Sequence, residues 1–220
     1  MGISVKSLFV AALAIGAFAG WPAQTQTTDM TFFATSVGGG DGANLGGLEG
    51  ADAHCLNLAE AVGAGAKTWR AYLSTQGVGG GEAVNARDRI GTGPWHNAEG
   101  VEIAANVDAL HTEGANNIQK STALTEAGGI VNGRGDSPNQ HDMLTGTQQD
   151  GMAGTGENQT CDDWTSNGAG TAIVGHTDLQ GNTRGLNLWN YSHGSRGCSQ
   201  SNLVGTGGAG LFYCFAIREG

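Results

Sequence analysis

Histidine is the residue type in this chain with the widest range of site chemistry. The six histidines are His54, His96, His111, His141, His176 and His193. A helical zinc motif such as H-E-x-x-H places two histidines four residues apart, and no pair here has a comparably close spacing. Residues 194–197, which follow His193, lack the G-x-S-x-G pattern of a hydrolase nucleophile. The spacing therefore predicts neither a zinc centre nor a catalytic triad, and we expect a protein that is not an enzyme.

The composition indicates an acidic, glycine-rich globular chain of 220 residues. Ten Lys and Arg against twenty Asp and Glu give a formal net charge of −10. This charge repels nucleic acid, heparin-like polyanions and anionic lipid surfaces. The 40 glycines predict that loops outweigh regular elements. Five tryptophans and an apolar fraction of 39% are enough for one hydrophobic core, so we expect a single domain.

The N-terminus has the pattern of a secretory signal peptide. Lys6 precedes an apolar run, residues 8–19, that ends in Ala17-Phe18-Ala19. This run is shorter than the ~20 residues that cross a bilayer as a helix, and we expect no membrane span. We expect residues 1–19 to be removed, residues 20–30 to form a flexible lead-in, and residues 31–220 to form the domain of a secreted or periplasmic protein.

Export would place the four cysteines in an oxidising compartment, where disulfides are favoured over metal thiolates. Cys55, Cys161, Cys198 and Cys214 form no C-x-x-C pair. They allow three pairings, and the residues alone do not choose among them.

Hydrophobic patterning predicts a mixed α and β domain. A helix is expected from residue 48 to residue 62, where apolar residues recur at helical spacing, and a short one at residues 104–110. Strands are expected at residues 31–36, 68–75, 171–174, 185–191 and 211–217. The last of these is almost entirely apolar and should lie in the centre of a sheet. Residues 128–156 are mostly turn formers and predict a long irregular loop.

A set of ordered motifs resembles the endostatin domain of collagens XV and XVIII. The motifs are GADAHC at residues 50–55, AVG at 61–63, TWRAYLS at 68–74, CDDW at 161–164 and CFAI at 214–217. Secreted lectin-like proteins of bacterial style share the glycine-rich segment at residues 40–52. The resemblance implies an α+β, C-type-lectin-like fold: a small mixed sheet, one or two helices, long glycine-rich loops and two nested disulfides, Cys55 with Cys214 and Cys161 with Cys198.

The zinc and heparin binding of endostatin is not implied here. Endostatin holds zinc through N-terminal histidines, and residues 20–30 contain none. It binds heparin through a basic surface, whereas this chain is acidic.

Two tripeptides are similar to those with which sugar-binding C-type lectins hold calcium and sugar hydroxyls. They are Ser137-Pro138-Asn139 and Trp189-Asn190-Tyr191, although Ser137 replaces an acid and Tyr191 replaces an aspartate. Calcium needs several oxygen ligands, which neighbouring carboxylates can supply. The implied ligand-binding set is Asp136, Asn139, Asp142, Glu157, Trp189 and Asn190. Calcium, the one candidate cofactor, would lie at Asp136, Asn139, Asp142 and Asn190. Ordinary turn chemistry of Asn and Asp is the alternative explanation.

The resemblance implies a secreted recognition domain that binds carbohydrate, such as a surface glycoconjugate, or another extracellular ligand. Residues 128–156 and 182–196 would supply the binding loops. The alternative is a structural or adhesive extracellular protein that acts through protein–protein contacts. A secreted hydrolase is the third hypothesis, and it requires a histidine within hydrogen-bond reach of a serine and an acid in a pocket.

Overall fold

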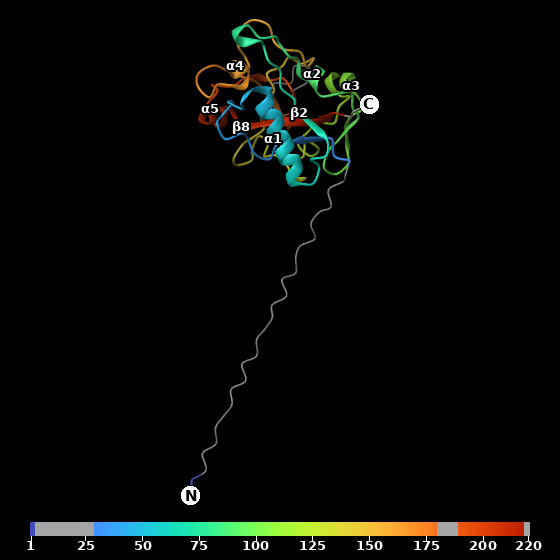
Figure 1. The fold of residues 1–220 in the computed structure, drawn as a ribbon, viewed down its shortest axis with the longest axis vertical. Helices are drawn as coiled ribbons and strands as arrows, with labels where there is room; N and C mark the ends of the chain where they lie inside the picture. The colour runs from blue at the N-terminus through green and yellow to red at the C-terminus, as the bar shows by residue number, and fades with distance from the viewer. Residues whose placement is uncertain (3–28, 180–188, 218–220) are drawn as a thin grey trace.

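The longest strand, β8 (Gly208–Ile217), lies at the centre of the main sheet in the computed structural model, which describes residues 1–2, 29–179 and 189–217 (Figure 1). It pairs antiparallel with β1 (Phe32–Ala34) and β2 (Thr68–Ala71), and parallel with β5 (Asp142–Leu144). The sheet continues from β5 to β6 (Ile173–His176) and ends at β7 (His193–Gly194), both antiparallel. The central position expected for the last strand is confirmed.

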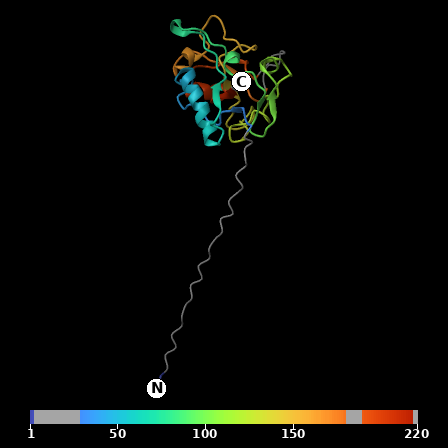
Figure 2. The same ribbon diagram turned by 45° about the vertical axis from the view of Figure 1, so that its right-hand side comes forward.

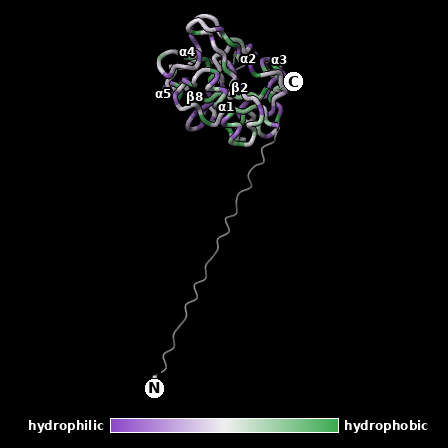
Figure 3. The backbone as a smooth tube through the Cα atoms, in the orientation of Figure 1, coloured by the Kyte–Doolittle hydropathy of each residue, from purple (hydrophilic) through white to green (hydrophobic). Residues whose placement is uncertain are grey.

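Short elements surround this sheet. A separate two-stranded sheet consists of β3 (Trp95–His96) and β4 (Glu102–Ala104). The helices in the described residues are α1 (Gly47–Ala61), α2 (Ala86–Arg89), α3 (Val107–His111), α4 (Cys161–Trp164), α5 (Gln200–Thr206) and the 3-10 turn η1 (Val78–Gly80). None of these helices is long and apolar enough to cross a membrane. Hydrophilic and hydrophobic segments are intermixed along the tube in Figure 3.

Both faces of β8 are buried because its successive side chains point to opposite sides of the sheet. Phe212, Cys214 and Ala216 belong to one buried cluster, which α1 covers. Leu211, Tyr213 and Phe215 belong to the other. Figure 2 shows α1 on one side of β8 and the segment that carries β3, β4 and α3 on the other. A strand that is buried on both faces has a continuous apolar sequence, and this pattern is why β8 could be predicted from the sequence.

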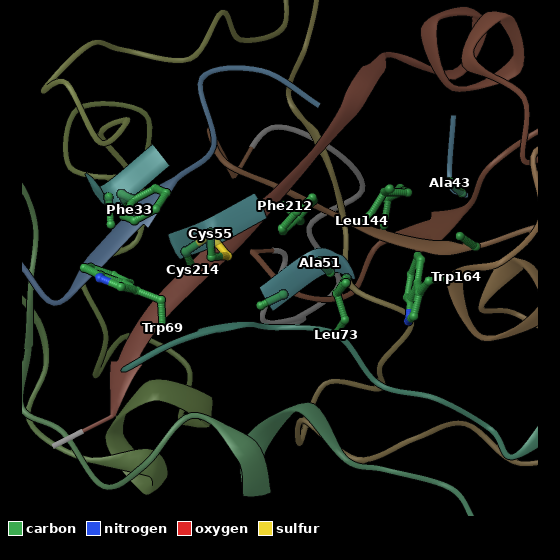
Figure 4. Packing of buried hydrophobic residues seen from close by; sticks show 14 of the residues in the cluster. Phe33, Ala43, Ala51, Cys55, Trp69, Leu73, Leu144, Trp164, Phe212 and Cys214 are labelled. Atoms are coloured by element: carbon green, nitrogen blue, oxygen red, sulfur yellow. A yellow bond between two sulfur atoms is a disulfide. The ribbon is translucent and has the colours of Figure 1, made fainter. Parts of the chain in front are cut away.

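The helix α1 packs through residues at four-residue spacing. Its buried residues are Ala51, Cys55 and Ala59, which lie on one face of the helix. Cys55 forms a disulfide with Cys214 in the core, next to Phe212, Phe33 and Trp69 (Figure 4). The small alanines allow the helix to approach the sheet closely. The helix predicted from residue 48 is therefore confirmed, as is the inward direction of Cys55.

Both disulfides are nested as the resemblance implies. Cys55 pairs with Cys214 and Cys161 pairs with Cys198, at sequence separations of 159 and 37. No free cysteine is present among the described residues. The first bond joins α1 to β8, and the second joins α4 to the segment before α5. The mixed α+β class with two disulfides agrees with the expectation from the sequence.

Three expectations need correction or fall outside the described residues. The stretch 128–156 is not wholly irregular, because it contains β5, which is stabilised by its neighbours β8 and β6 rather than by its own residue preferences. Residues 185–188 of the expected strand 185–191 lie outside the described residues, and Trp189 and Asn190 form a turn. Residues 3–28, which hold most of the expected leader, also lie outside them. Seven further short elements were not predicted: β3, β4, β7, η1, α2, α4 and α5.

Removing each disulfide tests how much it stabilises the fold. The chain-entropy model predicts a loss in unfolding free energy of about 5 kcal/mol for Cys55→Ala/Cys214→Ala and about 4 kcal/mol for Cys161→Ala/Cys198→Ala, because the longer loop restricts the unfolded chain more. Urea unfolding of both double variants beside the wild type measures these losses. Equal stability of the wild type and the Cys55/Cys214 variant would contradict the assignment of this bond as the main covalent constraint.

Candidate metal centre

Strand register brings an aspartate and two histidines from distant parts of the chain together. Asp142, the first residue of β5, lies directly opposite His176, the last residue of β6. His193 on β7 lies opposite Val174, two residues from His176 on the same face of β6. His141 lies just before β5. Because it is outside the strand, its side chain can lie on the same face of the sheet as that of its neighbour Asp142. Four side chains therefore converge at one end of the sheet, and we call them the His/Asp cluster.

The Oδ1 atom of Asp142 is the centre of the His/Asp cluster. The Nε2 atoms of His141 and His176 both lie 3.2 Å from it, and the Nε2 atom of His193 lies 3.8 Å from it. The Nε2 atoms of His176 and His193 are 3.0 Å apart. The rings of His141 and His176 stack, with centroids 4.2 Å apart and planes inclined by 15°.

The carboxylate of Asp142 is buried without a hydrogen bond. The residue is only 3% exposed, and no donor among the described residues makes a hydrogen bond to Oδ1 or Oδ2. The two imidazole nitrogens at 3.2 Å are close but are not aligned to donate. A buried charged group left without a partner costs several kcal/mol. A bound cation would satisfy this carboxylate and would offset the cost.

The spacing fits a small metal ion with nitrogen and oxygen ligands. In a tetrahedral site with metal–ligand distances of about 2.0–2.1 Å, ligand atoms lie about 3.3–3.4 Å apart. The 3.2 Å and 3.0 Å separations around Asp142 and His176 are close to that value. The ligand atoms of His141, Asp142 and His176 all lie within 4.8 Å of one another. Imidazole and carboxylate donors together favour Zn²⁺ and related transition metals, whereas calcium prefers oxygen ligands throughout.

A second carboxylate orients the ring of His141. Its Nδ1 atom donates to Oδ1 of Asp178 at 2.9 Å, which directs the lone pair of Nε2 toward Asp142. The other oxygen of Asp178 accepts a hydrogen bond from the backbone N–H of Arg134 at 2.6 Å. A carboxylate behind a ligating histidine is the usual support of a metal centre, because it fixes the tautomer and raises the basicity of the ligand.

The other two rings also turn Nε2 toward the cluster. Nδ1 of His193 lies 3.2 Å from the carbonyl oxygen of Gly194, and Nδ1 of His176 lies 3.5 Å from Oγ of Ser192. With its proton on Nδ1, His193 presents the Nε2 lone pair to His176. The two Nε2 atoms at 3.0 Å form a hydrogen bond when His176 carries its proton on Nε2, and they would both be ligands of a cation bound between them.

The residues predicted for calcium and sugar binding lie in separate environments. Asp142 belongs to the His/Asp cluster. Asn139 lies beside it, because a side chain at Gly207 would meet both Nδ2 of Asn139 and Oδ2 of Asp142. Asp136 is at the surface, where Lys120 donates to its carboxylate at 2.5 Å and lowers its pKa. The backbone carbonyl of Glu157 accepts from the amide of Gln76.

Trp189 and Asn190 lie in the core rather than at the surface. Both are fully buried, and the ring of Trp189 lies 4.8 Å from that of Tyr72. The side-chain amide of Asn190 donates to the Tyr72 hydroxyl at 3.0 Å and to the carbonyls of Gln148 and Gln149. Neither residue offers a surface on which a sugar ring could stack in this conformation.

The hydrolase hypothesis can be compared with the surroundings of His176. Ser192 and Asp142 lie at opposite nitrogens of this ring, at 3.5 Å and 3.2 Å. The first distance is at the limit of a hydrogen bond. The enclosed space beside Asp142, next to Leu144 and Val174, is too small for a water molecule. Among the described residues, the space beside this Ser–His–Asp arrangement is therefore too small for a substrate.

Sequence spacing did not reveal the cluster. His141 and Asp178 are 37 positions apart, and His176 and His193 are 17 apart. The only local signals are the adjacent His141-Asp142 pair and the pair His176 and Asp178. Strand register brings these pairs together, and register is set by contacts between distant segments.

No protein-family model and no curated protein sequence matches this chain. The resemblance to endostatin and C-type-lectin-like domains therefore stays a prediction, and the function must be argued from the geometry.

A buried histidine outside the cluster predicts a pH dependence of stability. His111 accepts or donates at Tyr72 Oη at 2.7 Å, and burial lowers the pKa of His111 below its usual value. The unfolded chain takes up this proton near pH 6.5, so the stabilisation is complete above that pH and is lost as the pH falls below it. In EDTA, we expect the wild type to lose more unfolding free energy than His111→Gln between pH 7 and 5, measured by urea unfolding. Parallel pH profiles would contradict the neutral state of His111.

Proposed function

We propose that this chain binds a divalent transition metal ion, with Zn²⁺ as the best chemical match, through His141, Asp142 and His176, with His193 beside them. One observation supports this most strongly. The carboxylate of Asp142 is buried without a hydrogen-bond partner among the described residues, and the Nε2 atoms of three histidines surround it.

The ion would join segments that the sequence predicts as binding loops. His141 and Asp142 belong to residues 128–156, and His193 belongs to residues 182–196. A bound ion would hold β5 and β7 against β6 and stabilise this end of the sheet. A ligand that binds only the folded state adds about 2.7 kcal/mol of stability at a concentration of 100 times its Kd. We propose that a domain stabilised in this way serves recognition of a carbohydrate or another extracellular ligand.

The compartment suits such a centre. Two disulfides are typical of proteins in oxidising compartments, consistent with an extracellular or periplasmic location. With both cysteine pairs used in these bonds, the described residues offer imidazole and carboxylate rather than thiolate as metal ligands. Sites of this composition bind Zn²⁺ without thiol oxidation affecting them.

The substitution Asp142→Asn tests the proposal because it changes metal binding and apo stability in opposite directions. Replacing the unpaired carboxylate with a neutral amide of the same shape should raise the unfolding free energy of the metal-free protein by about 1–3 kcal/mol. The same change should abolish Zn²⁺ binding, because the anionic ligand is lost. Urea unfolding in EDTA and calorimetric titration with Zn²⁺ measure the two effects.

Asp136→Asn is the matched control, since Asp136 is a surface carboxylate paired with Lys120 outside the cluster. It should leave Zn²⁺ affinity unchanged. Unchanged Zn²⁺ affinity in Asp142→Asn, or no Zn²⁺ binding by the wild type, would refute the proposed centre.

A further inference from the structure

We infer that His193 occupies an exchangeable coordination position, which admits an external neutral nitrogen donor of the imidazole type. The inference rests on the proposed metal binding and adds the class of ligand that the centre accepts. It follows from differences in burial, support and charge within the His/Asp cluster.

Burial separates His193 from the other three side chains. The side chains of His141, Asp142 and His176 are 7%, 2% and 5% exposed, whereas that of His193 is 42% exposed. Three ligands thus form an enclosed base, and the fourth stands between this base and the solvent. A ligand that arrives from solution meets His193 first.

His193 is also held in place less firmly than His141 and His176. His176 lies on β6 between β5 and β7, and the carboxylate of Asp178 holds the ring of His141. His193 lies on the two-residue strand β7, at the end of the described sheet. Its Nδ1 donates to the carbonyl of the next residue, Gly194, at 3.2 Å. Its Nε2 is also farther from Oδ1 of Asp142, at 3.8 Å against 3.2 Å for the other two histidines.

These differences make His193 the ligand with the lowest cost of release. Rotating its side chain into solvent breaks one side-chain contact to another strand, that of its Nε2 with Nε2 of His176 at 3.0 Å, and leaves the enclosed base intact. Three protein ligands with one open position is the arrangement of metal sites that bind external ligands, while four fixed protein ligands are typical of structural sites.

Charge favours a neutral donor at the open position. The carboxylates of Asp142 and Asp178 together balance the two positive charges of the ion, and the chain as a whole carries a net charge of −10. An anion would meet no net positive charge at this centre and a repulsive field around it. A neutral nitrogen donor avoids this penalty, and an imidazole matches the group that it replaces.

The test uses Co²⁺, whose visible absorption reports the ligands around it and which binds the same nitrogen and oxygen donors as Zn²⁺. His193→Ala should still bind Co²⁺, with a Kd about 10–100-fold higher than that of the wild type, the range typical when support of a metal site is lost. Imidazole should then change the spectrum of the Co²⁺-loaded variant at a concentration at least tenfold lower than in the wild type, where His193 competes. Sodium azide, the anionic probe, should cause no comparable change.

A histidine-containing tripeptide with blocked termini distinguishes two sources of the donor. Binding of the tripeptide as well as imidazole indicates that a histidine of another chain can reach the ion, and binding of imidazole alone indicates a small ligand; both outcomes support the exchangeable position. His96→Ala is the control, because His96 lies near Glu102 on β4 rather than in the cluster. It should behave like the wild type.

Three results would overturn the inference. Complete loss of Co²⁺ binding in His193→Ala would make His193 an obligatory ligand. An unchanged spectrum with imidazole would show a closed position, and azide binding as tight as imidazole binding would contradict the charge argument. Failure of the wild type to bind Co²⁺ is a different result, since it would refute the metal centre itself.

Discussion

The pairing of β8 with β5 is the contact on which the arrangement of the molecule depends. β8 is buried on both faces and holds β1 and β2 along its C-terminal part, while its N-terminal part pairs with β5. The Cys55–Cys214 disulfide fixes α1 to the same strand. The register of β5 against β8 determines where Asp142 lies, and the register of β6 against β5 then sets His176 opposite to it. The core thus positions the cluster at one end of the sheet.

That position is costly without a bound ion. The fold gains its stability mainly from apolar burial around β8, yet it places a carboxylate where no donor among the described residues satisfies it. Buried polar groups in stable proteins are normally hydrogen-bonded, and exceptions often mark functional sites. Three imidazoles lie beside the carboxylate, and Asp178 holds the ring of His141. Together with Asp142 these rings would form the ligands of a cation that offsets this cost. The proposed cation would satisfy the carboxylate and both stacked rings at once.

Elements with a strong local pattern could be predicted from the sequence. The helix α1 has apolar residues at helical spacing, and β8 is a continuous apolar run, so both were identified near their observed bounds. The nested disulfides followed from the motif resemblance. Trp189 shows the limit of that approach, because the tripeptide similarity placed it in a sugar site while the structure buries it against Tyr72.

The short strands and the His/Asp cluster could not be predicted in this way. β5 and β7 have three and two residues, too few for a periodic signal, and they exist because longer neighbours offer them hydrogen bonds. Asp142 was identified as a ligand residue, but its partners were not, since no spacing along the chain links His141 to His176. Such a cluster depends on strand register, which only the folded structure displays.

The most direct test of the account is X-ray absorption at the zinc edge of the oxidised protein after loading with Zn²⁺ and removal of excess metal. We expect one ion per chain, nitrogen and oxygen ligands at about 2.0–2.1 Å, the outer-shell scattering of imidazole rings and no sulfur ligand. Loss of the ion during removal of the excess, or a spectrum of water oxygens without imidazole scattering, would contradict a metal centre at His141, Asp142 and His176.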